Sequence, residues 1–461
     1  MRNSSISKVI LASAALACGA IGAQTLMASS VQVVPPSTTP CVTGPPIYPT
    51  ITLAVNSVFA GSTIFVCPGT YAEQVVITKK LNLTGVSSNG TNGPSASGAD
   101  NPVVTSPAGG VVQNTTSLAT GNPIAAQILV GGTNPGVLTG VAISNITVDG
   151  SNNLLSGCGA AELIGIFYQN ASGTINHVAT RHQRLDTADN GCQNGLGIFV
   201  QSGNSLTSTV TIENSSVHSY QKNGITGNEV GTNVTITNNY VVGQGSTTGA
   251  AENGIQIGFG GTGKVSGNTV MDDLWAPDTI SDPGDAASGI LIYGGGSTLP
   301  GSGGITIGGN VVGSAQFSIA LIDDTFDGFY ADGSTITTNR VLGTQIFDAI
   351  DVCANNNTVS SNTVFASDES ALHLDSSCGG TGNGNTINKN TLNETCAGVL
   401  EGSGTSGNLL GTGTNANSFY NVGSTTLNAD ICSSPVFGAT GGSGLKGRTK
   451  NRGPRPAPAR P

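Results

Sequence analysis

The sequence predicts an all-β solenoid, a parallel β-helix of about ten coils. Short runs of β-branched residues recur along the chain, separated by Asn and Gly. Charged residues are only 9% of the chain, and Gly is 68 of its 461 residues. Two short phrases also repeat in alternation. Because each coil of a solenoid buries its apolar side chains by stacking on its neighbours, these repeats predict one continuous core.

The first phrase consists of an apolar residue, two small or polar residues, Asn, any residue and an apolar residue. Asn suits the bend between two strands because it tolerates left-handed backbone and can hydrogen-bond its own turn. Stacked over the coils, these asparagines are expected to form a ladder, so a structural role is favoured for nearly all of them. The clear copies are ITNNYV from Ile236, VSGNTV from Val265, IGGNVV from Ile307, ITTNRV from Ile336, VSSNTV from Val359 and INKNTL from Ile387, with looser copies from Ile143, Ile175 and Ile212.

The second phrase is a small residue followed by alternating apolar positions, and its copies lie 22 to 35 residues apart. This spacing fits a basic coil of about 22 residues with loop insertions. Alternation places one set of side chains inside the solenoid and the other set on its outer face. The copies include GIQI at Gly254, GILI at Gly289, SIAL at Ser318, AIDV at Ala349 and ALHL at Ala371.

The N-terminal part of the repeat region combines YPTITLAVNSVFAG with the stretch GSTIFVCPGTYAEQVVITKKLNLTG at residues 61–85. These segments resemble the first coil of the pectate-lyase-like right-handed parallel β-helix superfamily. The resemblance covers about residues 40–435 and implies a right-handed helix. It also implies a short N-terminal capping helix, here Pro49–Val58, held by a Cys41–Cys67 disulfide. A cap is needed because the end coil otherwise exposes core and unpaired strand edges.

The chain is predicted to begin with a secretory signal peptide at residues 1–23, because an apolar run follows Lys8. Cys18 leaves lipidation as a less favoured alternative. A linker at 24–40, a β-helix domain at 41–435 and a disordered, basic, Pro/Gly-rich tail at 436–461 follow. No later apolar run is long enough to span a bilayer. We therefore expect a secreted protein, periplasmic or extracellular, and a monomer.

Eight cysteines remain after removal of the signal peptide. An even number in a chain bound for an oxidising compartment predicts disulfides, although eight cysteines allow 105 connectivities. A cysteine metal site is disfavoured because no C-x-x-C occurs. Pairing in sequence order gives Cys41–Cys67, Cys158–Cys192, Cys353–Cys378 and Cys396–Cys432.

Charge is unevenly distributed along the chain. All 26 acidic residues lie between Glu73 and Asp430, a part of the chain that holds only eight of the 16 basic residues. This body therefore carries a net charge of −18 at pH 7. Such a field repels polyanions, which disfavours nucleic acid as a partner, as well as pectate or alginate without a bridging cation.

Titratable residues are concentrated in AIDV, ALHL and their flanks, and these supply the candidate catalytic residues Asp348, Asp351, His373 and Asp375. If the two phrases stack, Asp351 and His373 occupy equivalent outward positions on adjacent strands, about 4.8 Å apart. Neighbouring carboxylates push their pKa values apart, which provides the acid and the base that glycosidic cleavage needs. The alternative is an exposed acidic rim that keeps the solenoid in solution. The catalytic motifs of polygalacturonases, pectin methylesterases and pectate lyases are absent.

The stretch NHVATRHQRLD supplies the candidate substrate-binding residues Arg181, His182 and Arg184. An arginine there could clamp a carboxylate, phosphate or sugar sulfate, or act as the base of a lyase. The alternative is a loop whose arginines pair with Asp186 and Asp189.

The insertion MDDLWAPDTISDPGDAASG supplies Trp275, which could stack on a sugar ring. Its carboxylates make Ca²⁺ a candidate ligand. However, Asp beside Pro or Gly is also ordinary turn chemistry, and no metal-ligating residue is assigned. The carboxylates are Asp272, Asp273, Asp278, Asp282 and Asp285.

Two classes of function fit these observations. In the first, the protein is a carbohydrate-active hydrolase or lyase, and a polysaccharide or cell-surface glycan lies along an outer sheet. In the second, it is a non-catalytic surface or adhesion-like protein whose rigid rod presents loops for binding. Aromatic residues are only 5% of the chain, which weakens the enzyme hypothesis because sugar-binding grooves generally use aromatic platforms.

Overall fold

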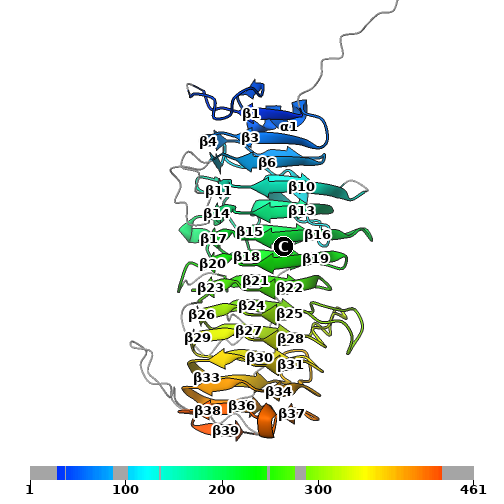
Figure 1. Cartoon of the computed structure of the whole chain (residues 1–461), viewed down its shortest axis with the longest axis vertical. Helices are drawn as coiled ribbons and strands as arrows, with labels where there is room; N and C mark the ends of the chain where they lie inside the picture. Colours follow the sequence, from blue (N-terminus) through cyan, green and yellow to red (C-terminus); the bar gives the residue numbers. More distant parts are fainter. Residues whose placement is uncertain are drawn as a thin grey trace, which may run out of the picture.

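A computed structural model describes residues 29–36, 38–86, 102–133, 136–246, 250–275 and 287–427. Within these ranges the chain winds into a long rod of stacked coils (Figure 1), in which three strands per coil form three faces. Across the same ranges, no helix has both the length and the apolar character that a membrane crossing requires. The predicted signal peptide, the predicted tail and Cys432 lie outside the described residues.

The first face is a 14-stranded sheet whose successive strands pair in parallel. Without β1 and β2 at its N-terminal end, twelve described strands remain as rungs, against the about ten coils expected. In spatial order the strands are β2 (Ile47–Tyr48), β1 (Ser30–Val33), β3 (Ser62–Val66), β6 (Leu81–Gly85), β10 (Leu138–Ser144), β13 (Ala171–Asn176), β16 (Ser208–Glu213), β19 (Thr232–Thr237), β22 (Thr262–Ser266), β25 (Thr306–Gly308), β28 (Thr335–Thr337), β31 (Thr358–Ser360), β34 (Thr386–Asn388) and β37 (Leu409–Leu410).

The second and third faces are joined into one network of 25 strands. The second face holds β4 (Gly69–Ala72), β7 (Pro102–Thr105), β11 (Thr147–Asp149), β14 (Ala179–Arg181), β17 (Ser216–His218), β20 (Tyr240–Val242), β23 (Thr269–Met271), β26 (Val311–Ala315), β29 (Arg340–Thr344), β32 (Thr363–Val364), β35 (Thr391–Asn393) and β38 (Ser418–Tyr420). The third face holds β5 (Val75–Ile77), β9 (Pro123–Gly131), β12 (Glu162–Gln169), β15 (Leu196–Gln201), β18 (Asn223–Asn228), β21 (Asn253–Gly258), β24 (Ser288–Tyr293), β27 (Phe317–Ile322), β30 (Ile350–Cys353), β33 (Ser367–Leu374), β36 (Thr395–Glu401) and β39 (Ser424–Leu427). The short β8 (Thr115–Thr116) pairs antiparallel with β9.

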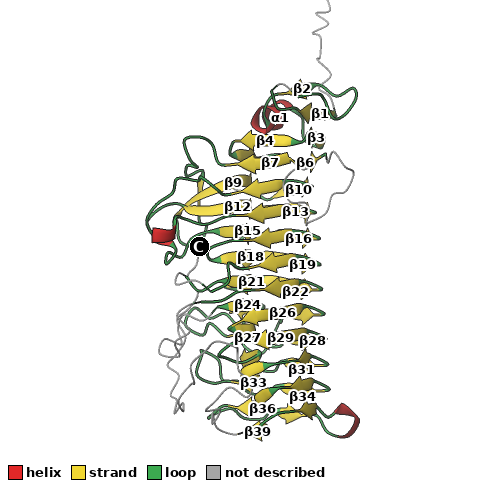
Figure 2. Ribbon diagram, turned by 90° about the vertical axis from the view of Figure 1, so that its left-hand side faces the viewer, coloured by secondary structure: helices red, strands yellow, loops and turns green. Residues whose placement is uncertain are grey.

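Many loops that connect the second face to the third are long. They project from one edge of the rod, where the 3₁₀ turn η1 (Thr187–Asp189) also lies (Figure 2). A second 3₁₀ turn, η2 (Gly413–Asn415), follows β37.

The core runs along the inside of the rod because apolar side chains alternate with outward ones on every strand. On the third face one interior row is in register over eight strands, and all its side chains are fully buried. Burial of one such side chain contributes about 1.5–3 kcal/mol. The row is Ile166, Ile198, Ile225, Ile255, Ile290, Ile319, Ile350 and Leu372.

The predicted asparagine ladder is confirmed at the bend between the first and second faces. The backbone N–H and side-chain amide of Asn268 both donate to Asn310 Oδ1, at 2.9 and 3.0 Å. The left-handed backbone falls on the residue before the ladder asparagine, such as Gly267 with φ 68° and Gly309 with φ 67°, at every position of the ladder except the last, Asn417. The same pattern of contacts links Asn239, Asn268, Asn310, Asn339, Asn362, Asn390 and Asn417.

The predicted capping helix is confirmed as α1 (Ile51–Ser57), beside the N-terminal end of the rod. The Thr50 side chain accepts from the Leu53 N–H, and the Glu73 carboxylate accepts from the backbone N–H groups of Ile51 and Thr52, at 2.8 and 2.9 Å. These contacts satisfy donors that a helix N-terminus leaves unpaired. β1 lies within the segment 24–40 that was predicted as a linker, and it pairs with β3.

Three of the predicted disulfides are confirmed: Cys41–Cys67, Cys158–Cys192 and Cys353–Cys378. The fourth predicted pair includes Cys432, which is not among the described residues. The predicted fold class, a right-handed parallel β-helix with a short N-terminal helix, is confirmed.

Candidate functional site

The strongest candidate site is the group formed by Asp348, Asp351, His373 and Asp375, here called the acidic cluster. Asp351 on β30 is in register with His373 on β33, as the sequence predicted. Both alternate with interior residues, so they point to the outer side of the third face. The His373 Nδ1 atom lies 3.1 Å from Asp348 Oδ2 and 3.9 Å from Asp351 Oδ1.

All four side chains of the acidic cluster are buried. Asp348 and Asp351 are 0% exposed, Asp375 is 3% exposed and His373 is 4% exposed. The alternative prediction of an exposed acidic rim is therefore wrong for these carboxylates. Burial removes charge from water at a large cost unless opposite charges and hydrogen bonds compensate it.

The electrostatics of the acidic cluster favour an imidazolium. Burial by itself lowers the pKa of His373, but the negative charges of Asp348, Asp375 and Asp351 outweigh it and raise the pKa to about 9. Asp348 is held in turn by the backbone N–H and the hydroxyl of Ser370, at 3.1 and 2.6 Å. At neutral pH His373 is thus a cation held between carboxylates.

Asp375 has a different environment from the other three residues. Its Oδ1 accepts from the backbone N–H and the hydroxyl of Ser377, at 2.8 and 2.7 Å, which is ordinary turn geometry. The Cys353–Cys378 disulfide lies beside it, with Cys378 Sγ 3.4 Å from Asp375 Oδ2. Asp375 therefore acts on His373 through its charge and fixes the chain after β33.

Aromatic side chains gather next to the acidic cluster despite the low aromatic content of the chain. Phe317 and Phe347 stack with ring centroids 4.6 Å apart, and Phe259 and Tyr293 lie 5.5 Å apart. They belong to one buried apolar cluster that also contains Cys353. The third face therefore combines charged and aromatic side chains over neighbouring coils.

Three residues of the acidic cluster could ligate a metal ion. Asp348, Asp351 and His373 each offer a ligand atom, and these atoms lie within 4.8 Å of one another. An imidazole with two carboxylates suits a transition metal better than Ca²⁺, which prefers six to eight oxygen ligands. The carboxylates predicted for Ca²⁺ lie elsewhere, and three of them, Asp278, Asp282 and Asp285, fall outside the described residues.

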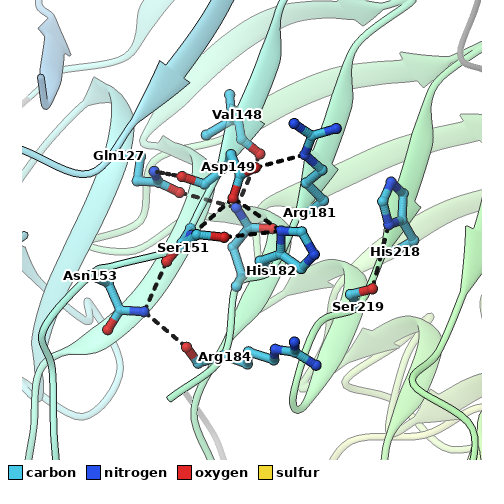
Figure 3. Close-up of polar contacts among 12 residues, drawn as sticks. Gln127, Val148, Asp149, Ser151, Asn153, Arg181, His182, Arg184, His218 and Ser219 are labelled. Atoms are coloured by element: carbon cyan, nitrogen blue, oxygen red, sulfur yellow. Dashed lines mark hydrogen bonds and ion pairs between the residues drawn. The ribbon is translucent and has the colours of Figure 1, made fainter. Parts of the chain in front are cut away.

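A second group lies on the outer side of the second face and is here called the arginine cluster: Asp149, Ser151, Arg181, His182 and His218. Figure 3 shows the Arg181 and His182 side chains converging on Asp149. Arg181 Nε donates to Asp149 Oδ2 at 2.7 Å, and His182 Nδ1 lies 3.1 Å from Asp149 Oδ1. Ser151 adds its backbone N–H to the same carboxylate at 2.9 Å.

The carboxylate of the arginine cluster is firmly ionised. Burial alone would raise the pKa of Asp149, but hydrogen bonds from Ser151, Arg181 and His182 lower it to about 2. Burial lowers the pKa of His218, and the nearby charges of His182 and Arg181 lower it further. The cluster thus combines a fixed ion pair with a neutral imidazole, and the Arg181 and His182 side chains are 23% and 35% exposed.

The structure corrects the predicted pairing of this region. Arg181 pairs with Asp149, and Arg184 donates to Gln244 at 2.9 Å, so the expectation that these arginines pair with Asp186 and Asp189 is wrong. Asp189 instead accepts from the Gly157 N–H.

The predicted catalytic and substrate-binding residues are not brought together. β14, which carries Arg181, and β29, which precedes Asp348, are five rungs apart on the second face, about 24 Å. Trp275 follows β23, between these coils, and its backbone exchanges hydrogen bonds with the Gln316 side chain.

Sequence reasoning missed Asp149 and His218, although a signal for both was present. Asp149, Arg181 and His218 are in register on β11, β14 and β17. Each stands six positions after the first residue of a looser copy of the asparagine phrase, at Ile143, Ile175 and Ile212. Aligning these copies would have placed the three side chains in one column.

No family model matches the chain, and no curated protein matches it. Among solved structures, the chain is similar to a GH136 lacto-N-biosidase from Eubacterium ramulus, with a TM-score of 0.48 and 11% identity over 84% of this chain and 64% of that one. It is also similar to a mannuronan C-5 epimerase A-module from Azotobacter vinelandii, with a TM-score of 0.45 and 12% identity over 82% and 90% of the two chains. A DFA-IIIase from Arthrobacter chlorophenolicus A6 gives 0.46 and 14% over 77% and 87%.

Proposed function

We propose that the protein is a secreted carbohydrate-active enzyme that binds and cleaves a polysaccharide along the outer side of its third face. The observation that carries this proposal is the contact of His373 with two carboxylates of the preceding coil, at 3.1 and 3.9 Å. Catalytic sites typically set a titratable group and its perturbing charges side by side in this way. The three disulfides support an oxidising compartment.

The roles follow from the electrostatics of the acidic cluster. His373, whose pKa is raised to about 9, donates a proton to the leaving oxygen of the glycosidic bond. Asp351 acts as the base or nucleophile, and Asp348 orients the imidazole through the contact with Nδ1. The proton comes from His373 Nε2, the ring nitrogen that does not contact Asp348.

The arginine cluster, on the outer side of the second face, is a second contact for a polymer that extends from the third face across the edge that it shares with the second face. Arg181 contacts Asp149 through Nε alone. Within the described residues, its two terminal guanidinium nitrogens make no hydrogen bond. Two terminal NH2 groups on a guanidinium held by an ion pair suit a carboxylate or sulfate substituent on a sugar. Together with His182 and Arg184, Arg181 is therefore proposed to bind substrate, and Trp275 to contact it between the two clusters.

The proposal is tested by incubating the mature protein with neutral and acidic polysaccharides, with Ca²⁺ or with a chelator. New reducing ends and ultraviolet absorbance from unsaturated products are recorded together. Reducing ends alone indicate a hydrolase, and added absorbance indicates a lyase. Loss of activity with the chelator that added Ca²⁺ restores would indicate that the candidate ion Ca²⁺ is required. Absence of products from every polymer contradicts the enzyme proposal.

A second candidate function is a non-catalytic glycan-binding rod. The burial of the acidic cluster favours it, because Asp351 is 0% exposed and a buried ion cluster can simply fix neighbouring coils in register. Binding of a polymer, measured by calorimetry on the same panel, without formation of any product would establish this function instead.

A further inference from the structure

A cavity of about 410 Å³ lies at the start of three neighbouring strands of the third face, in coils other than those that carry the acidic cluster. Its wall comes from the residues just before β9, the loop before β12 and the loop before β15. The Cys158–Cys192 disulfide joins the last two of these loops. The volume falls in the range of small-molecule sites in proteins.

Glu162, the first residue of β12, lines this cavity and is only 8% exposed. The Gly195 N–H donates to its carboxyl group, but the Oε1 atom has no hydrogen-bond partner within the described part of the chain. A buried polar oxygen without a partner is unusual in folded proteins and calls for an explanation such as a bound ligand.

The framework around Glu162 is rigid. Asn194 Oδ1 accepts from the Leu163 N–H at 3.0 Å, and Asn194 Nδ2 donates to the Ala161 carbonyl at 3.1 Å. One amide thus clamps the chain on both sides of Glu162. Such a preformed site loses little conformational entropy when a ligand binds.

The wall of the cavity is polar but nearly uncharged. Asn122 and Gln193 are exposed amides that line it, and Glu162 is the sole titratable carboxyl among the described residues that do so. Burial raises the pKa of Glu162 to about 8, although the Gly195 N–H and the charge of Lys222 oppose this shift. The carboxyl is therefore protonated at neutral pH and can both donate and accept hydrogen bonds.

We propose that this cavity binds one neutral sugar unit, with the Glu162 carboxyl group hydrogen-bonded to a sugar hydroxyl. Amides and a neutral carboxyl group match the alternating donors and acceptors of a polyol, whereas a charged ligand finds no fixed counter-charge on this wall. β12 and β30 are six rungs apart, about 29 Å, so the site is separate from the acidic cluster. The inference therefore does not depend on the proposed cleavage.

Isothermal titration calorimetry of the mature protein with glucose, galactose, mannose, xylose and N-acetylglucosamine tests this site. At least one sugar is expected to bind at pH 6, and its affinity should fall about 30-fold at pH 9.5, because that pH lies about 1.5 units above the carboxyl pKa. Glu162→Gln, which keeps a neutral donor and acceptor, should bind about equally at both pH values. Glu162→Leu should bind at least about tenfold more weakly.

Two controls separate this inference from the proposed function. Asp186→Asn removes an exposed carboxylate of the loop before β15 that does not line the cavity, and Asp351→Asn removes a residue of the acidic cluster; both should leave sugar binding unchanged. If a tetrasaccharide binds at least as tightly as its monosaccharide, the natural ligand is the end of a sugar chain. If the tetrasaccharide does not bind, the natural ligand is a free monosaccharide. Four results would each overturn the inference. They are no binding of any of the five sugars, wild-type binding that does not depend on pH, unchanged binding in Glu162→Leu, and tighter binding of a cationic amino sugar.

Discussion

The protonation of His373 offers a quantitative test of the acidic cluster. Its pKa rises from the ordinary value of 6.5 to about 9 in the folded protein. Each pKa unit corresponds to about 1.4 kcal/mol, so the imidazolium contributes about 3 kcal/mol of stability. Because the folded pKa lies above the unfolded value, this contribution is complete below pH 6.5 and is lost as the pH rises through about 9.

The assay combines nuclear magnetic resonance with urea unfolding. The chain has only four histidines, so the imidazole resonances can be assigned with single substitutions and followed from pH 5 to pH 10.5. The stability difference between wild type and His373→Asn should shrink by about 3 kcal/mol between pH 6 and pH 10.

His177→Asn is the matched control for this experiment. His177 lies outside both clusters and has a left-handed backbone, with φ 53°, which Asn tolerates. Its stability difference from wild type should change little over the same pH interval. A His373 resonance that titrates at or below pH 6.5, or a stability difference that does not depend on pH, would refute the ion cluster.

Three further predictions concern stability. Asn310→Ala breaks the ladder and leaves buried groups of its neighbours unpaired, so urea unfolding should show a loss of stability of about 2–4 kcal/mol. The control Asn233→Ala removes an exposed asparagine and should cost less than about 0.5 kcal/mol. Equal losses in the two variants would contradict the ladder. Burial and the charge of Asp273 raise the pKa of Glu252, so its neutral form is favoured in the fold and stability is lost as the pH rises above the unfolded pKa. Glu252→Gln should therefore raise the melting temperature at pH 8 but not at pH 4, and a gain equal at both pH values would refute this reason. Reduction of the disulfides should lower stability by about 2–4 kcal/mol for each bond lost, and a thiol assay that finds every cysteine reactive in the native protein would exclude the bonds.

The fold was predictable because residues with a fixed structural role, such as asparagine at a bend and isoleucine in the core, repeat with the period of the coil. The ladder asparagines recur over seven successive coils, and the interior row that includes Ile350 and Leu372 recurs over eight. The register of Asp351 with His373 follows from these repeats. Solenoids have this property because each coil contacts mainly its neighbours.

The surroundings of the candidate site were less predictable. Alternation showed that Asp351 points outward, but it could not show that the outer side is covered, and the side chain is 0% exposed. The pairing of Arg181 with Asp149, 32 residues away, depends on how many residues each loop inserts. The contact of Asp348, just before β30, with His373 on the next coil also depends on the conformation of a loop.

The most direct test of the proposed function compares kcat/KM for Asp351→Asn and Asp186→Asn on the polysaccharide that gives products. The proposal predicts that Asp351→Asn lowers kcat/KM by about 10²–10⁴-fold with a melting temperature within a few degrees of wild type. The same proposal predicts that Asp186→Asn, whose altered side chain is exposed and outside both clusters, retains full activity. Full activity in Asp351→Asn would contradict the assignment of the acidic cluster as the catalytic site.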